Sequence, residues 1–574
     1  MSDGPGSQNS VAPDGSSEQA DVHDVIIIGA GPCGLAVAAR LREQAPAPIF
    51  TDEEHRRYWW LRKHKRWIAT KHVKDGRVSC RPQVPVPELD VVVLDADNDQ
   101  WLSRWDRLFT MYDIQHLRSP MFWHMDPGER DSLLAFAHET ERVDELVEIR
   151  HCVGKELSKH ARKKRQGRRG GDIEPREINE RERTDYFNPS RSLFSEHARS
   201  VASRYGLING LVQKESVLDI QFGVVDAVST GGEPLFTVDS NKGRRYAKVV
   251  VLAVGPANKP TIPAIPTTCP SATPADTKPR QMCHSMHIEH FPDPIIQKKI
   301  NAGQQTTVLV VGGGLTSSQL SDLAVRRGVT TVWHIMRGPF RVKPFDLDLE
   351  WMSKYRNVQQ AMFWSADSDE ERLQMIKAAR GGGSMTPTFS KRLHAHVSSG
   401  RVKLRTNTAI VGLDYMYRGC GRENKSPGSG SWIVTTDPPI PDLPPMDYIY
   451  FATGVQSDFS TLGYLQTMMA SNPIQGFGGF PCLNDDLMWK DGVPLFVTGK
   501  LAALRLGPGA ANLGGAMVGA ERIALALMEL LSSRRRRGET PKGSQPHAKR
   551  GNGLFSYNVG LGSKYHCLGQ EEVV

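Results

Sequence analysis

Long apolar runs are absent from this chain of 574 residues. No uninterrupted run reaches the roughly 18 residues that a membrane-spanning helix needs, so no span is expected. The N-terminal sequence MSDGPGSQNSVAPDGSSEQADVHD is polar and has no apolar signal core, which predicts a protein that is not secreted. We therefore expect a cytoplasmic location.

Closely spaced cysteines are also absent. The eight cysteines are scattered along the chain and form no C-x-x-C pair. Scattered free thiols are typical of a reducing compartment. A dithiol–disulfide reductase needs two sulfurs close together, so the cysteine spacing argues against that chemistry.

The chain lacks a uniform basic charge. Its 72 Lys and Arg against 63 Asp and Glu give a net charge of +9. Residues 155–169 carry +7 and residues 534–550 carry +6, so the rest of the chain is slightly acidic. Nucleic acid is therefore not an expected partner. Each basic run is typical of a solvated loop or tail; a nuclear-targeting or anionic-surface patch is the alternative.

A first glycine motif, Gly29-Ala-Gly31-Pro-Cys-Gly34, lies between a β-branched run and a helix-forming run. Gly29 permits a tight turn, and Gly31 lets the backbone approach a pyrophosphate. Gly34 lets the helix pack closely on the strand. The N–H groups at the helix N-terminus would then face the phosphates. The motif predicts a dinucleotide site.

An acidic residue is expected after this motif, at the end of the next strand. Residues 48–52 read as that strand and end at Asp52. A carboxylate there is placed to bind a ribose hydroxyl, and Glu53 is the fallback.

A second glycine motif, Gly312-Gly-Gly314-Leu-Thr-Ser317, also lies between a strand and a helix expected over 316–327. Ser317 replaces the third glycine, so the helix is expected to pack slightly more loosely on the strand. The next strand, 331–336, is followed by Arg337 rather than by an acid. Arginine binds a 2′-phosphate in a planar fork, which favours NADPH over NADH.

Arg341 and Lys343 are placed to assist Arg337, and a salt-bridged surface arginine is the alternative. Two dinucleotide units of different preference indicate one bound flavin and one visiting nicotinamide, with hydride passing from the second to the first. The acid-ended unit would take FAD and the Arg-ended unit NADPH.

We therefore predict an α/β protein with two Rossmann-like dinucleotide-binding domains, the NADPH domain being inserted in a split FAD domain. Helices are also expected over 133–153, 192–206 and 515–531. The predicted ranges are 1–22 (disordered tail), 23–300 (FAD domain, first part), 301–440 (NADPH domain), 441–532 (FAD domain, closing part) and 533–574 (basic flexible tail).

Several further segments carry a family resemblance. They are Ala253-Val-Gly255, His284-Ser285, Ala452-Thr-Gly454, Pro494–Gly499 and Gly507-Pro-Gly with Asn512. With the two glycine motifs, they resemble the two-dinucleotide-binding-domain flavoproteins. They resemble in particular the single-component NADPH-dependent flavin monooxygenases, a group that includes the ornithine/lysine N-hydroxylases and the Baeyer–Villiger enzymes. Related fungal and bacterial FAD/NAD(P)-binding proteins look most similar. It implies that Gly499 and Asn512 belong to the closing FAD segment.

The resemblance also implies a catalytic segment and shows a departure. His116 to His124 is similar to the segment that approaches the flavin ring in these proteins. Arg118 would stabilise negative charge on reduced flavin, and Trp123 would exclude water; an ordinary loop with a buried Trp is the alternative. Family members commonly have Gly-Asp in the closing segment, whereas this chain has Gly499-Lys500, so Lys500 would face a phosphate or solvent.

A cluster of Cys283, His284, His287 and His290 contains zinc-type ligands, but its spacing matches no standard structural site, so no metal is predicted. The predicted function is an FAD- and NADPH-dependent monooxygenase that uses dioxygen and a C4a-peroxyflavin to oxygenate a small organic substrate. The alternatives are an NADPH-dependent flavin reductase or oxidase, and a non-catalytic FAD-binding regulatory protein. The sequence does not indicate the substrate or the oligomeric state.

Overall fold

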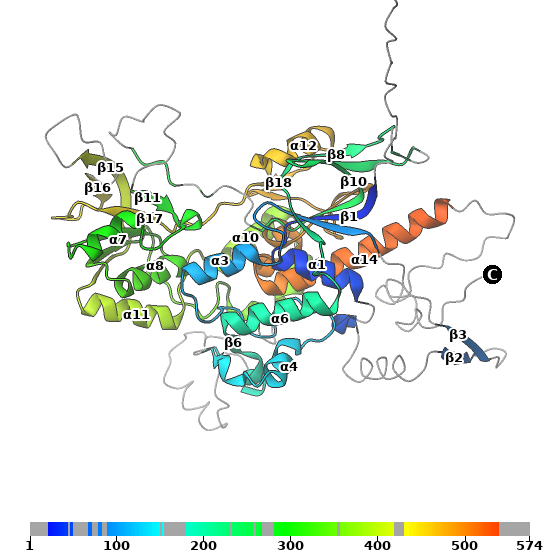
Figure 1. The fold of residues 1–574 in the computed structure, drawn as a ribbon, viewed down its shortest axis with the longest axis horizontal. Helices are drawn as coiled ribbons and strands as arrows, with labels where there is room; N and C mark the ends of the chain where they lie inside the picture. Colours follow the sequence, from blue (N-terminus) through cyan, green and yellow to red (C-terminus); the bar gives the residue numbers. More distant parts are fainter. Residues whose placement is uncertain are drawn as a thin grey trace, which may run out of the picture.

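The computed structural model describes residues 21–43, 46–49, 67–71, 78–82, 89–149, 152–153, 180–226, 228–229, 232–255, 260, 262–266, 281–352, 356–417 and 430–538. The described part of the chain forms two α/β units side by side, each built on a mainly or wholly parallel sheet (Figure 1). No helix among these residues is long and apolar enough to cross a membrane.

The sheet of the first unit takes strands from both ends of the chain. Its order is β20 (Met488–Lys490), β21 (Val493–Val497), β10 (Gly243–Leu252), β1 (Val22–Ile28), β4 (Val91–Asp95) and β7 (Val212–Lys214). Strands β21, β10, β1, β4 and β7 run parallel, while β20 pairs antiparallel with β21. The antiparallel strands β9 (Leu235–Ser240) and β8 (Val217–Gly223) extend from β10. Apolar residues of β1, β4, β10 and β21 fill the core of this unit.

Helices cover this first sheet. They include α1 (Pro32–Arg42), α3 (Ser103–Met111), α4 (Ser132–Glu139), α6 (Arg191–Arg204), α12 (Gln466–Ser471), α13 (Ala503–Leu506) and α14 (Leu513–Gly538). The N-terminal α1 and the C-terminal α14 pack against each other (Figure 1). Arg40 of α1 is 1% exposed, and its Nε donates to Glu521 of α14 at 2.5 Å. The last described helix is thus fixed to the first.

The sheet of the second unit is wholly parallel and lies in the middle of the sequence. Its order is β11 (Met282–His284), β17 (Tyr448–Phe451), β12 (Thr307–Val311), β13 (Thr331–Ile335) and β14 (Val402–Arg405). Val308 and Val310 pack with α8 (Leu315–Arg326) and α11 (Pro387–Ser398) on one face. Leu309 faces the other side, toward the hairpin of β15 (Ala409–Tyr417) and β16 (Gly430–Asp437).

The remaining elements lie around the two sheets. They are α7 (Pro294–Asn301), α9 (Arg356–Trp364), α10 (Asp369–Arg380) and the strand pairs β2 (Trp67–Lys71) with β3 (Val78–Pro82), β5 (Leu146–Glu148) with β6 (Phe187–Pro189), and β18 (Gly476–Phe477) with β19 (Phe480–Pro481).

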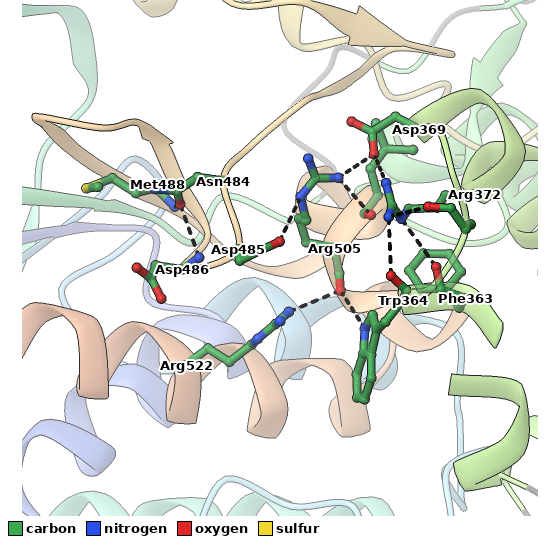
Figure 2. A network of polar contacts seen from close by, with 12 residues as sticks. Phe363, Trp364, Asp369, Arg372, Asn484, Asp485, Asp486, Met488, Arg505 and Arg522 are labelled. Atoms are coloured by element: carbon green, nitrogen blue, oxygen red, sulfur yellow. Dashed lines mark hydrogen bonds and ion pairs between the residues drawn. The ribbon is translucent and has the colours of Figure 1, made fainter. Parts of the chain in front are cut away.

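A polar network holds α9 and α10 against the closing segment of the first unit (Figure 2). Asp369 accepts from Arg372 of its own helix at 2.7 Å and from Arg505 of α13. Arg522 of α14 donates to the carbonyl of Arg505 at 3.1 Å, and the indole of Trp364 donates to the same carbonyl. The contacts of Asp369 and Trp364 with Arg505 join segments that are more than a hundred residues apart.

The predicted α/β architecture is confirmed, because the first sheet uses both ends of the chain and the second sheet uses the middle. The expected helices over 192–206 and 316–327 form as α6 and α8. Strands β11 and β17 belong to the second sheet, outside the predicted range 301–440.

The helix expected over 133–153 is wrong. Only Ser132–Glu139 are helical, and Leu146–Glu148 form strand β5. The chain turns because Glu141 has φ +55°, and β5 then pairs with β6, so a tertiary contact overrides the local helix propensity.

The predicted tails overlap partly with the described residues. Strand β1 begins at Val22, and residues 1–20 lie outside the described part. Helix α14 continues to Gly538, beyond the expected end at 531, and residues 539–574 lie outside. The basic run 155–169 also lies outside the described residues.

Candidate functional site: two glycine turns and a cationic cavity

In the first glycine turn, Gly29 and Gly34 are tightly surrounded by backbone atoms, whereas the space around Gly31 is open. Gly29 has φ +109°, and a Cβ there would lie 2.5 Å from the carbonyl oxygen of Ala253. A Cβ on Gly34 would lie 2.0 Å from the carbonyl oxygen of Gly29. Gly31 has no atom within 4 Å of a Cβ position, and no side chain caps α1. The open turn and free helix N-terminus fit a dinucleotide pyrophosphate.

The acid beside this turn is Asp95. The strand next to β1 is β4, which runs parallel to it and ends at Asp95. The carboxylate of Asp95 accepts from the backbone N–H groups of Ala30 at 2.8 Å and of Asp97 at 2.9 Å. Asp95 therefore lies at the carboxyl edge of the sheet, against the glycine turn, where a ribose-binding acid is expected.

The first two residues of the strand predicted over 48–52 belong instead to a 3₁₀-helix, Ala47–Ile49, and residues 50–52 lie outside the described part. Asp52 and Glu53 lie outside the described residues. Sequence reasoning missed Asp95 because it searched about 20 residues beyond Gly34. The signal was present in Val91–Asp95, a β-branched run that ends in an acid.

The second glycine turn repeats the first. Gly312 has φ +149°, and a Cβ there would lie 2.4 Å from the carbonyl oxygen of Ala452. Gly314 is open and caps α8 without a side chain. Ser317 is fully buried, and its hydroxyl donates to the Gly314 carbonyl at 2.7 Å, so this side chain is accommodated within the turn.

A buried histidine supports the second turn. Nε2 of His334 on β13 lies 2.9 Å from the carbonyl oxygen of Gly312, and Nδ1 lies 3.2 Å from the hydroxyl of Ser321. Burial lowers the pKa of His334 to about 4, so the ring is neutral at physiological pH.

A cavity of about 1840 Å³ opens beside the second turn and is lined by Gly312–Gly314. Seven cationic residues line it: Arg118, Arg337, Arg341, Arg380, Lys391, Arg392 and Lys500. Two acids line it, and each is paired: Asp113 with Arg326 and Glu148 with Arg183. Arg380 and Arg392 are also paired, with Asp346 and Asp322. The other five cations have no carboxylate partner among the described residues, so the cavity is electropositive, as a site for phosphates requires.

Of the predicted NADPH residues, Gly312, Gly314 and Arg337 line this cavity, whereas Ser317 does not. Arg337 follows β13 with an exposed side chain and lines the cavity. Arg341 also lines it, whereas Lys343 pairs with Asp348 at 2.8 Å. Sequence reasoning missed the loop Gly381–Gly383, which crosses the second turn. A Cβ on Gly383 would lie 3.2 Å from the backbone of Gly313.

The two predicted catalytic residues lie in different places. Arg118 lines the cavity and donates to the carbonyls of Lys343 at 3.0 Å and Pro344 at 3.2 Å. Burial lowers the pKa of Arg118 to about 10, although Asp346 opposes the shift. Trp123 is not among the lining residues; it packs against the start of α14, where a Cβ on Gly514 would lie 2.7 Å from its ring.

The closing segment lies between the two units. Gly499 has φ +72°, and a Cβ there would lie 3.1 Å from Sγ of Cys33 at the start of α1. Lys500 lines the cavity, and its Nζ donates to the carbonyl of Val455 at 3.1 Å. Asn512 donates to Asp346 at 2.8 Å.

Cysteine and histidine chemistry is not favoured in the described residues. Cys33, Cys152, Cys283 and Cys482 are free there, and burial raises the pKa of Cys33 to about 12. In the Cys283–His290 cluster, the ring of His284 contacts the carbonyl of Gly454 and accepts from the N–H of Met286. No group of three potential metal ligands occurs in the part of the chain that is described.

Comparison with known proteins identifies the class. The model of the pyridine nucleotide-disulphide oxidoreductase family matches residues 23–426, and the chain belongs to this family. It is therefore a flavin-dependent oxidoreductase, and the prediction of a flavoprotein with FAD and a nicotinamide dinucleotide is confirmed. None of the curated proteins is similar enough in sequence to match.

Solved structures of the same fold include an N-hydroxylase and two monooxygenases. The ornithine N-hydroxylase of Kutzneria sp. 744, with reduced FAD, NADP⁺ and L-ornithine, has a TM-score of 0.55 at 16% identity, covering 90% of this chain and 100% of that one. The cadaverine monooxygenase of Erwinia amylovora, bound to FAD, has a TM-score of 0.53 at 14% identity, covering 92% of this chain and 100% of that one. The L-lysine 6-monooxygenase of Pseudomonas syringae has a TM-score of 0.51 at 15% identity, covering 88% of this chain and 99% of that one.

Proposed function

We propose that this flavoprotein is an NADPH-dependent monooxygenase that transfers one oxygen atom to a small organic acceptor. The proposal rests on two open glycine turns whose neighbouring side chains have opposite charges. Asp95 lies beside the first turn, and Arg337 follows the strand beside the second. The cavity of about 1840 Å³ exceeds the roughly 300–1,000 Å³ of a typical ligand site, so it has room for a dinucleotide and an acceptor.

The proposal assigns residues to each cofactor. Gly29, Gly31, Gly34, Asp95, Gly499 and Asn512 would hold FAD, while Gly312, Gly314, Ser317 and Arg337 would hold NADPH. Asp52 stays an alternative ribose ligand. Arg337 favours the 2′-phosphate because its planar fork matches a phosphate and an acid would repel it.

Bound FAD would take hydride from NADPH and activate dioxygen. One turnover consumes NADPH, a proton, dioxygen and acceptor, and gives NADP⁺, water and the oxygenated product. The chain orients the nicotinamide with the second turn and stabilises negative charge with cationic residues of the cavity wall, Arg118 among them. Trp123 packs at the start of α14, where it would keep water from the flavin side.

The test is an absorbance spectrum of the purified protein, followed by anaerobic NADPH and then oxygen. We expect a yellow protein that bleaches with NADPH and then forms a persistent oxygen adduct of the flavin. Immediate reoxidation with stoichiometric peroxide, with every acceptor tried, would favour an oxidase. A protein that binds FAD but is not reduced by NADPH would favour a regulatory, non-catalytic role.

A further inference from the structure

Three cations line the cavity from three distant parts of the chain. Arg118 follows α3, Arg380 ends α10, and Lys500 lies in the closing segment. Arg118 and Arg380 bind the same stretch, since Arg118 donates to Pro344 and Arg380 pairs with Asp346 at 2.6 Å. The fold therefore gathers these cations in one wall of the cavity.

Only one carboxylate among the described residues pairs with this group. Asp346 accepts from Arg380 and from the side-chain amide of Asn512. The recorded partners of Arg118 and Lys500 are neutral: backbone carbonyls and, for Arg118, the hydroxyl of Ser384 at 3.0 Å. Neutral acceptors satisfy N–H groups but do not cancel charge, so positive charge remains in excess.

The mutual repulsion of these cations is visible in their proton affinities. Burial lowers the pKa of Lys500, and the nearby Arg380 lowers it further. Burial likewise lowers the pKa of Arg118; the nearby Asp346 opposes this shift, and Arg380 adds a smaller lowering effect. An anion that entered the cavity would offset this repulsion and raise both pKa values.

The nicotinamide dinucleotide has other cations for its phosphates. Arg337 and Arg341 follow the strand beside the second turn, and Lys391 and Arg392 come from α11. Lys500 instead follows Gly499, whose backbone packs against Cys33 of α1 in the first unit. Arg380 donates to the carbonyl of Pro508 in the closing segment at 2.9 Å. Lys500 and Arg380 thus lie where the closing segment meets the cavity, and Arg118 lies opposite Ser384 at the same cavity.

We infer that Arg118, Arg380 and Lys500 bind a carboxylate of the oxygen acceptor, so that the substrate class is small organic carboxylates. The inference rests on the proposed function, because it names the acceptor of that same site. Arg118 and Arg380 are anchored by the second unit and the closing segment. Lys500, which has one recorded hydrogen bond, is the cation best able to reorient toward the ligand.

The test is calorimetric binding to the FAD-loaded protein saturated with NADP⁺. The probes are carboxylates from acetate to adipate, with glutaramide as the neutral counterpart of glutarate. We expect at least one carboxylate to bind and its neutral amide not to bind. Lys500→Met should weaken carboxylate binding about tenfold or more, because a buried charge contact is lost. Lys500→Arg should restore most of it, and the exposed Lys403→Met should have no effect.

Three results would overturn the inference. They are no saturable binding of any carboxylate, equal binding of glutaramide, and a loss of NADP⁺ affinity in Lys500→Met with unchanged carboxylate binding. The last would assign the cations to the dinucleotide phosphates. Flavin reduction by NADPH is measured on the same samples. Reduction without carboxylate binding contradicts this inference alone, whereas a flavin that NADPH does not reduce contradicts the proposed function.

Discussion

At the scale of single residues, the glycines of the first turn differ in what surrounds them. Gly34→Ala places a methyl group 2.0 Å from a backbone oxygen, so we expect a loss of about 1–3 kcal/mol or more of unfolding free energy. Gly31→Ala meets no atom within 4 Å and should leave the apoprotein nearly as stable. It should nevertheless lower FAD occupancy, because the methyl group occupies the pyrophosphate position. Urea unfolding of the apoproteins and flavin content check this, and equal destabilisation would contradict it.

Arg337 gives a second prediction at this scale. Arg337→Ala should raise the KM for NADPH about tenfold or more and change the KM for NADH little, because only NADPH has a 2′-phosphate. The control is Arg356→Ala, at an exposed arginine of α9 that does not line the cavity. Steady-state kinetics with both nucleotides measures the effect. An unchanged preference for NADPH over NADH would contradict the assignment of Arg337 to the 2′-phosphate.

At the scale of one element, His334 makes the second turn sensitive to acid. Its pKa is about 4 in the folded protein against 6.5 in the unfolded chain, so the unfolded chain binds more protons between these values. Stability from this residue is complete above about pH 6.5 and falls as pH decreases toward 4, by up to roughly 3 kcal/mol.

His334→Asn should therefore be less stable than the parent protein at pH 7, with a difference that shrinks on acidification. Urea unfolding of both proteins at several pH values measures that difference. Other carboxylates and histidines contribute equally to both proteins and cancel in the comparison. A difference that is constant from pH 7 to pH 4 would contradict the prediction.

At the scale of the whole molecule, the Arg40–Glu521 pair fixes the last helix to the first. Glu521→Leu leaves Arg40 buried without its partner and should cost about 3–5 kcal/mol. The double replacement Arg40→Met with Glu521→Leu should recover much of that loss, because no buried charge remains. Urea unfolding measures the unfolding free energy of both variants. Equal losses of unfolding free energy in the two variants would show that burial of the helix face, not the unpaired charge, sets the cost.

Prediction from the sequence succeeded where a pattern is local. The two glycine turns, the strands before them and helices α1 and α8 lie in short continuous segments, and the structure contains each of them. The same reasoning failed over 133–153, where the pairing of β5 with β6 replaces a helix. It also missed strand β4, Val91–Asp95, which pairs with β1 and lies several dozen residues beyond α1.

Adjacent residues were sufficient to specify the α/β class and the two turns, since a strand, a glycine turn and a helix each arise from a short continuous segment. Only the tertiary structure placed Asp95 against Ala30, 65 positions away, and Arg118 against Ser384, 266 positions away. It also gathered Arg380 and Lys500 at the same cavity. Such contacts depend on which strands become neighbours and how the units pack, and no spacing along the chain encodes them.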